Sequence, residues 1–331
     1  MFDKSFHPRI LLRNPHLQTL AEAIFPEKRS IEGAVQHRVS VSDGDQVVVH
    51  DDCPADWSDG DPLVLLLHGL CGCHQSGYMR RVAGKLTNRG IRAFRLDHRG
   101  CGSGRGLAAQ PYNAARSEDV GSVGNFLHDL YPDSPVGIVG FSLSGNILLR
   151  YLGREQNSVA PNVVAAAAVN PPVDLARCVA TVQRSAFGLY DRYFTRLLYR
   201  RIRNTPQWRD ELPIARVRRL PTRIREFDES FTAPASGYTS ADEYYAVGSA
   251  AAVVGNILVP VLILASEDDP LVPVDSFEHL TLAANTTLRI ERNGGHLRFI
   301  SGLSGDPDRH WMDWRVVDWI TEQIMTRAGG R

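Results

Sequence analysis

The stretch VGIVGFSLSGNILLRYLG, residues 136–153, predicts the central unit of the fold. It begins with the apolar run Val136–Val139, which is typical of a strand buried on both faces. Ser142 then stands close to small residues, and the apolar spacing that follows indicates a helix ending near Gly153. A strand, a sharp turn and a helix in this order would lift the Ser142 hydroxyl above the edge of a sheet.

The residues around Ser142 form a relaxed version of G-x-S-x-G, a turn that carries the nucleophile in a large class of hydrolases. The positions two before and two after such a serine have to be small, because the strand and helix backbones pass close together there. Gly140 meets this requirement, whereas the last position is Ser144, which adds a hydroxymethyl group beside Gly145. We predict that Ser142 is a nucleophile. The alternative is a structural serine in a tight turn.

The remainder of the chain alternates short apolar runs with helical patterns. Strands are expected at 62–69, 91–97, 136–140, 163–170, 259–266 and 287–293, and helices at 76–89, 114–130, 142–152, 275–284 and 311–327. Residues 1–34 are expected to form an N-terminal arm, and 35–52 an antiparallel hairpin around the turn Asp43-Gly44. This alternation predicts a single α/β domain over 1–331 with a mostly parallel, doubly wound sheet.

The alternation stops between about 174 and 250, where we expect a helical cap inserted between two core strands. Thirteen arginines lie between Arg177 and Arg225. They could support weak association with a membrane surface or hold an anionic head group, or they form an ordinary solvated face. Asp228 is expected to be a hinge or helix-capping residue. The aromatic residues of the segment are expected in the core or in a substrate pocket: Phe187, Tyr190, Tyr193, Phe194 and Trp208.

A serine nucleophile of this type is followed along the chain by an acid and then a histidine. Asp268 and Asp269 come directly after the apolar run 259–266, and we favour Asp269 because it precedes a P-x-x-P-like turn. His296 follows Gly294 and Gly295, which permit the unusual backbone angles that would return a loop over the sheet. An imidazole there can accept and return a proton near neutral pH.

Two backbone N–H groups are needed to stabilise an oxyanion. We predict those of Leu143, directly after the nucleophile, and Leu70, in the loop after the run 62–69. His68 in that loop is expected to hold its shape rather than to take part in chemistry. Cys71 and Cys73 lack suitably spaced partners for a metal, so the sequence predicts neither a metal nor a cofactor.

Composition narrows the class of protein. The 331 residues contain 37 Lys and Arg against 37 Asp and Glu, so there is no overall field that would attract nucleic acid. No apolar run approaches the roughly 18 residues of a membrane helix, and the first residues lack a signal-peptide pattern. Five scattered cysteines are typical of reduced thiols. We expect a cytoplasmic protein without an integral membrane segment.

The chain resembles the YheT-like hydrolases, the type 4 family of the α/β-hydrolase superfamily. Besides 140–153, the resemblance rests on NPHLQTL (14–20), LLLHGLCG (65–72), DHRGCGSG (97–104), FTAPASGYTSADEYY (231–245) and NGGHLRFISG (293–302). Members usually read G-F-S-L-G-G-N where this chain has Ser144. The resemblance implies the α/β-hydrolase fold, with the family's catalytic serine, aspartate and histidine at Ser142, Asp269 and His296. It also implies hydrolysis of carboxylic esters, from short- and medium-chain acyl esters to lipid-like esters.

The sequence is therefore compatible with three functions. The leading one is a serine esterase or lipase-like hydrolase that forms an acyl-enzyme and acts on small-molecule or lipid-like esters. The second is an acyltransferase, in which an alcohol takes the place of water. The third is a hydrolase-fold protein that binds a ligand without catalysis. Labelling by a serine-directed probe separates the third from the first two.

Overall fold

A computed structural model describes residues 4–24, 33–154, 156–211, 221–302 and 304–328. Within them, eight strands form one sheet in the order β1-β2-β4-β3-β5-β6-β7-β8. The hairpin partners β1 and β2 are antiparallel, β2 is antiparallel to β4, and all other neighbours are parallel. The strands are β1 (Val35–Ser40), β2 (Gln46–Asp52), β3 (Leu63–Leu67), β4 (Arg92–Asp97), β5 (Val136–Phe141), β6 (Val163–Val169), β7 (Val261–Ser266) and β8 (Thr286–Glu291).

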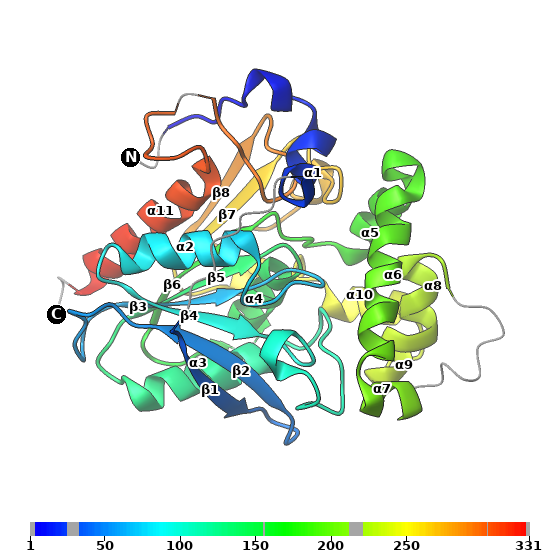
Figure 1. The fold of residues 1–331 in the computed structure, drawn as a ribbon, viewed down its shortest axis with the longest axis horizontal. Coiled ribbons are helices and arrows are strands. Elements are labelled where there is room, and N and C mark those ends of the chain that lie inside the picture. The colour runs from blue at the N-terminus through cyan, green and yellow to red at the C-terminus, as the bar shows by residue number, and fades with distance from the viewer. Residues whose placement is uncertain (1–3, 25–32, 155, 212–220, 303, 329–331) are drawn as a thin grey trace.

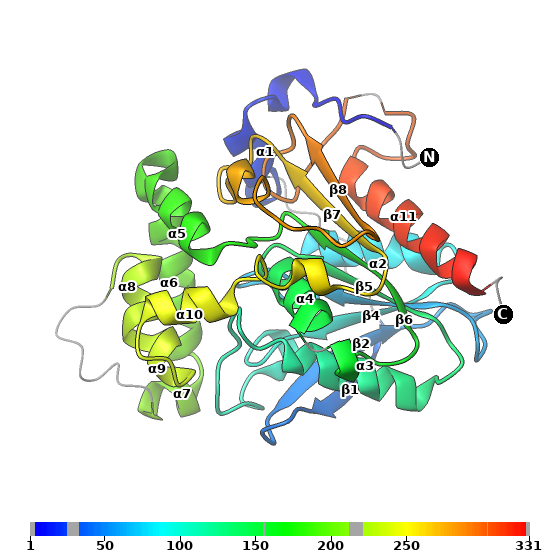
Figure 2. The same ribbon diagram turned by 180° about the vertical axis from the view of Figure 1, so that it is seen from behind.

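The central strands β3, β5, β6 and β7 are buried along their whole length. Helices cover both of their faces, which explains why their sequences read as continuous apolar runs rather than as an alternation. Helices α2 (Gly77–Thr87) and α11 (Trp311–Ala328) pack together on one face. Helices α3 (Glu118–Leu130) and α4 (Leu143–Arg154) cover the other (Figures 1 and 2). The predicted doubly wound α/β architecture is confirmed.

The helix predicted at 275–284 is wrong. That segment holds the short turn η8 (Val274–Ser276) and is otherwise irregular. The side chains that produced its helical spacing are Phe277, which is buried, and Leu280 and Leu282, which pack on the same core cluster. They reach the core from an irregular connection between β7 and β8, so a pattern of burial imitated a helical period.

A group of helices connects β6 to β7 and stands apart from the two layers of the sheet (Figure 1). They are α5 (Leu175–Arg184), η4 (Ser185–Gly188), α6 (Leu189–Arg203), α7 (Pro206–Glu211), α8 (Ile224–Phe227), the π-helical turn η6 (Asp228–Thr232), α9 (Ala233–Ala235) and α10 (Ala241–Gly248). Trp208 of α7 is fully buried and donates a hydrogen bond from Nε1 to the carbonyl of Ala108 at 2.9 Å. Gly100 makes room for it, since a Cβ there would lie 1.9 Å from the indole. The indole therefore anchors these helices to the core.

The N-terminal segment packs beside the last strand. It contains the turn η1 (Ile10–Leu12) and helix α1 (Pro15–Ile24). Arg9 N–H donates to the carbonyl of Ile300 at 3.2 Å, and the Phe6 ring packs against Phe299 and Trp311. The smaller turns are η2 (Gly102–Gly104), η3 (Gln156–Ser158) and η7 (Val254–Asn256).

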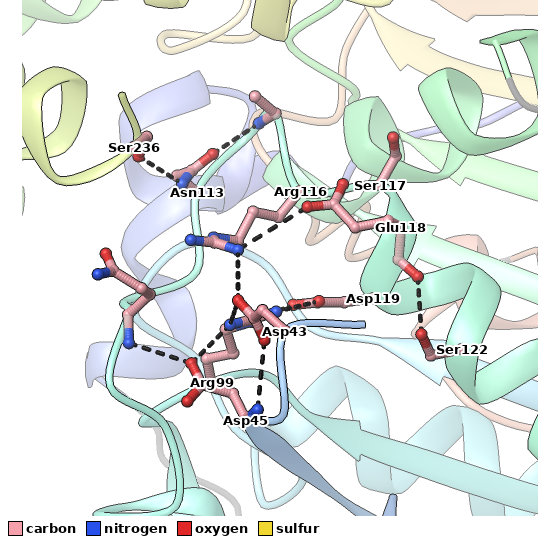
Figure 3. A network of polar contacts seen from close by, with 12 residues as sticks. Asp43, Asp45, Arg99, Asn113, Arg116, Ser117, Glu118, Asp119, Ser122 and Ser236 are labelled. Carbon is pink, nitrogen blue, oxygen red and sulfur yellow. Dashed lines mark hydrogen bonds and ion pairs between the residues drawn. The ribbon is translucent and has the colours of Figure 1, made fainter. Parts of the chain in front are cut away.

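A buried arginine joins the β1–β2 hairpin to α3 (Figure 3). Arg99, directly after β4, forms two hydrogen bonds with the carboxylate of Asp119, at 2.6 and 2.7 Å. Its remaining terminal nitrogen donates to Asp43 at 2.7 Å and to Asp45 at 2.6 Å in the hairpin turn. Although burial disfavours the charge, the hydrogen bonds with Asp119 and Asp43 raise the pKa of Arg99. The guanidinium is thus a fixed cation that joins three elements.

Candidate active site

Ser142 occupies a strained turn between β5 and α4. Its φ is 52°, a left-handed value that L-residues rarely adopt, and its N–H donates to the carbonyl of Val169 at 2.8 Å. A Cβ on Gly140 would lie 2.4 Å from the carbonyl oxygen of Ser144, so only glycine fits at that position. The strand–turn–helix unit therefore has the geometry of a nucleophile elbow.

Ser144 fits into this elbow because its hydroxyl is fully buried and hydrogen-bonded. The hydroxyl donates its only hydrogen to the carbonyl of His68. Its oxygen must therefore act as the acceptor in the contact with His98, from Nε2–H at 2.8 Å. His98 N–H donates in turn to Nε2 of His68 at 3.3 Å, and Nδ1–H of His68 donates to the carbonyl of Gly69 at 2.8 Å. Burial lowers the pKa of His68 to about 4 and that of His98 well below its usual value, so both rings are neutral. Ser144 thereby ties the elbow to the loop after β3.

His296 lies between Ser142 and Asp269. Its Nε2 is 2.9 Å from Ser142 Oγ, and its Nδ1 is 2.7 Å from Asp269 Oδ2. Since a carboxylate only accepts, Nδ1 carries the hydrogen and Nε2 is free to accept the serine proton. The structure thus brings Ser142, His296 and Asp269 into hydrogen-bonded contact.

Asp269, not Asp268, holds the imidazole. Asp269 also accepts from Nδ2 of Asn170 at 2.7 Å, and from the N–H groups of Leu271 and Val272 at 2.8 and 3.1 Å. Asp268 instead accepts from the N–H of Gly295 at 3.0 Å, and burial raises the pKa of its carboxyl. Its role in the structure is to shape the histidine loop.

Helix α1 supports that loop from outside. The His296 N–H donates to Oγ1 of Thr19 at 3.0 Å. Gly295 has φ of 57°, and a Cβ there would lie 2.7 Å from the carbonyl of Pro15. Neither Thr19 nor Asn170 was predicted from the sequence. A polar residue at the end of the apolar run 163–170 was the only signal for Asn170. For Thr19, the signal was its place in the segment 14–20 that carried the family resemblance.

Two tyrosine hydroxyls hold the loop that contains Leu70. Tyr78 accepts from the N–H of Gly69 at 2.9 Å, and Tyr112 accepts from the N–H of Cys71 at 3.0 Å. Leu70 itself and Leu143 line the same cavity as Ser142. Leu143 is the first residue of α4, where a helix leaves its N–H groups without intrahelical partners. The residues that carry the two predicted oxyanion donors therefore line the cavity together with Ser142.

A cavity of about 1070 Å³ separates the serine turn from the helices between β6 and β7. Its walls are mostly apolar and come from α1, from the loops after β3, β5 and β7, and from α5, α6 and α10. Of the aromatic residues considered above, Tyr190, Tyr193 and Phe194 line it. Phe187 is 99% exposed, and Trp208 is buried elsewhere. Size and polarity suit an acyl chain or another apolar group.

Asp228 is the carboxylate of this lining. It accepts from Oγ1 of Thr232 at 2.6 Å and from the hydroxyl of Tyr245 at 2.7 Å. Burial raises its pKa to about 6. These contacts join the π-helical turn to α10, and Asp228 directly follows the last residue of α8. The hinge or helix-capping role expected for this residue stays a prediction.

The raised pKa of Asp228 has a consequence for stability. The folded state holds this proton more tightly than the unfolded chain, whose carboxyl has the usual pKa of 3.8. The stabilisation that this bound proton gives the folded state is therefore fully present below about pH 4. It is lost as the pH rises through 6, which lowers the free energy of unfolding by about 3 kcal/mol, the equivalent of two pKa units. Urea unfolding of the wild type and Asp228→Asn at pH 4 and pH 7 should show the wild type losing this amount relative to the variant. Equal losses in both proteins would contradict the assignment.

In the described part of the chain, a cluster of three side chains could hold a metal ion. It consists of His50, His74 and Asp97, whose potential ligand atoms lie within 4.8 Å of one another. Both histidines already hydrogen-bond to the carboxylate, since His50 Nε2 and His74 Nδ1 lie 3.1 and 2.6 Å from Asp97 Oδ2. The N–H groups of His74 and Ser103 also donate to this carboxylate, at 2.7 and 2.8 Å. Burial raises the pKa of Asp97, but these histidines outweigh it and hold the pKa below its usual range. The contacts suit a structural clasp between β2, β4 and the loop after β3.

Comparison with known proteins agrees with the α/β fold. A family model described as "alpha/beta hydrolase fold" matches residues 62–303. The protein "Putative esterase YheT" of Escherichia coli (strain K12) is 29% identical over 328 residues, covering 98% of this chain and 95% of the relative. "Phospholipase ABHD3" of Mus musculus is 27% identical over 318 residues, covering 91% and 74%.

Solved structures show the same fold at lower identity. An esterase of Pyrococcus furiosus aligns with a TM-score of 0.55 and 17% identity, over 97% of this chain and 98% of its own. In the described residues, none of the helices combines the length and apolar character needed to cross a bilayer. The predicted resemblance to the YheT-like hydrolases is confirmed, and the chain belongs to the α/β-hydrolase fold family.

Proposed function

We propose that the protein is a serine esterase that cleaves carboxylic esters through an acyl-enzyme formed on Ser142. The observation that carries the proposal is the position of the His296 ring, with one nitrogen 2.9 Å from Ser142 Oγ and the other 2.7 Å from Asp269. Sequence similarity to proteins named esterase and phospholipase supports carboxylic ester hydrolysis as the class of reaction.

Catalysis would proceed in two steps. His296 Nε2 takes the proton of Ser142 as Oγ attacks the ester carbonyl, and Asp269 stabilises the imidazolium. The N–H groups of Leu143 and Leu70 receive the oxyanion. His296 then returns the proton to the leaving alcohol. Water, activated by the same imidazole, cleaves the acyl-enzyme and regenerates Ser142.

The helices between β6 and β7 are proposed to act as a cap over this site, within a single domain. Their apolar side chains face the cavity beside Ser142, for example Val179, Leu189 and Phe194. A short- or medium-chain acyl group, or one chain of a lipid-like ester, would lie against them. The five cysteines are free, which supports a cytoplasmic location.

The test is labelling by a fluorophosphonate probe together with turnover of a p-nitrophenyl ester series. Wild type should be labelled, and Ser142→Ala should lose both labelling and turnover. Ser122→Ala on α3, whose hydroxyl only bonds to the carbonyl of Glu118, serves as the matched serine control and should behave as wild type. A folded wild type that is not labelled would favour the binding-protein hypothesis. Esters of an added alcohol among the products would favour the acyltransferase.

A further inference from the structure

The exposure of lining residues from α1 and α6 places the opening of the cavity between α1 and the start of α6. Leu20, Leu189 and Tyr193 line the cavity and are also exposed, by 41%, 62% and 56%. The ring of His16 stacks on Tyr190 and its Nδ1 lies 3.1 Å from the tyrosine hydroxyl, so the two elements meet beside this opening. A substrate that reaches Ser142 from here passes an apolar rim.

Further apolar side chains outside the cavity extend this rim. Phe187 is 99% exposed, and both Ala186 and Phe187 have left-handed φ values, 47° and 55°. A strained backbone that leaves a phenyl ring in water contributes nothing to folding. In η1, which precedes α1 along the chain, Ile10 and Leu11 are 76% and 75% exposed. In Figures 1 and 2, η1, α1 and the junction of α5 and α6 all lie along the upper side of the molecule.

Arginines border both apolar groups. Arg9 and Arg13 flank η1, and Arg184 and Arg192 flank Phe187; all four are exposed. The ion pairs of the described residues involve none of these four, so their charge faces solvent. Exposed aromatic and aliphatic side chains surrounded by arginine are the composition that binds the interface of an anionic membrane.

We propose that this mouth face, made of Ile10, Leu11, Phe187 and Leu189 with Arg9, Arg13, Arg184 and Arg192, docks on an anionic lipid surface. A protein partner seated here would cover the opening of the cavity. A lipid surface instead places ester molecules directly at it, with the arginines among the anionic head groups. The inference rests on the proposed function only for what then enters the cavity.

Co-sedimentation with vesicles tests the docking without any turnover. Wild type and Ser142→Ala should both bind vesicles of phosphatidylglycerol and phosphatidylcholine, and bind at least tenfold more weakly to phosphatidylcholine alone. Leu11→Asp/Phe187→Asp should lose at least tenfold in affinity for the anionic vesicles. Aspartate tolerates the left-handed backbone at position 187 better than most residues. Neither residue lines the cavity, so hydrolysis of a water-soluble p-nitrophenyl ester should stay within twofold.

Leu258→Asp is the matched control. Leu258 is 70% exposed but precedes β7, so it lies at the opposite end of the parallel strands from Ser142. Its variant should bind as wild type.

Arg184→Gln/Arg192→Gln should reduce the preference for anionic vesicles. Wild type that ignores both kinds of vesicle, or a double aspartate variant that binds unchanged, would overturn the proposal. So would a dimer that the double variant dissociates, because the mouth face would then join two copies. Vesicle binding without probe labelling would remove the proposed function and keep the docking.

Discussion

Asp269→Asn should lower kcat for ester hydrolysis by about 10⁴-fold, the size of effect seen when a triad aspartate is neutralised. The carboxylate now fixes hydrogen on Nδ1 of His296, at 2.7 Å, and leaves Nε2 free for the serine proton. An asparagine amide offers a donor in place of one carboxylate oxygen, which favours the other tautomer. With hydrogen on Nε2, the ring cannot act as the base.

Asp268→Asn is the matched control, because the two residues are neighbours with different partners. The side-chain carbonyl of asparagine still accepts from the N–H of Gly295, the contact that Asp268 makes. Its kcat should stay within about tenfold of wild type. Rates on p-nitrophenyl butyrate, with circular dichroism to verify folding, measure both variants. A larger loss in Asp268→Asn than in Asp269→Asn would reverse the assignment of the acid.

Arg99→Met should lower the free energy of unfolding by about 3–5 kcal/mol, because it leaves a buried carboxylate without its cation. Arg99 is fully buried, and Asp119, its bidentate partner, is 1% exposed. The same change removes the contacts to Asp43 and Asp45 that fix the hairpin turn. Urea unfolding at pH 7 gives the value directly.

Arg116→Met provides the comparison. Arg116 pairs with Asp43 at 3.2 Å and with Glu118 at 3.8 Å, and both of these carboxylates are 39% exposed. Exposed pairs contribute about 0–1 kcal/mol, so this variant should change little. Adding Asp119→Asn to Arg99→Met should recover part of the loss, since it removes the unpaired charge. If Arg99→Met costs no more than Arg116→Met, the buried cation is not what holds hairpin and helix together.

The sequence predicted those features of the fold and of the site that depend on a few neighbouring residues. Runs such as 62–69 and 136–140 predicted buried strands because burial on both faces leaves no room for polar alternation. The relaxed motif around Ser142 predicted a nucleophile because the strand before it and the helix after it could be recognised in the same stretch. The order of Ser142, Asp269 and His296 along the chain then limited the choice of acid and base.

Contacts between distant segments could not be predicted in this way. Asn170 and Thr19 touch the residues of the site from elements that residue type alone does not connect with it. The role of Ser144 depended on whether His68 and His98 would lie within hydrogen-bond reach, which is a property of the packed fold. The helix predicted at 275–284 was wrong for a related reason, since burial of Phe277 and its neighbours imitates a helical period.

The contact between Thr19 and the loop of His296 spans 277 positions of the chain. Ribosomes add about 5–20 residues per second, so roughly 15–55 s separate the synthesis of the two partners. During that interval the growing chain contains Ser142 but not yet the imidazole of His296. By the proposed mechanism, a polypeptide still being translated is inert toward esters. Activity would begin only when the C-terminal third emerges and closes on the N-terminal helix.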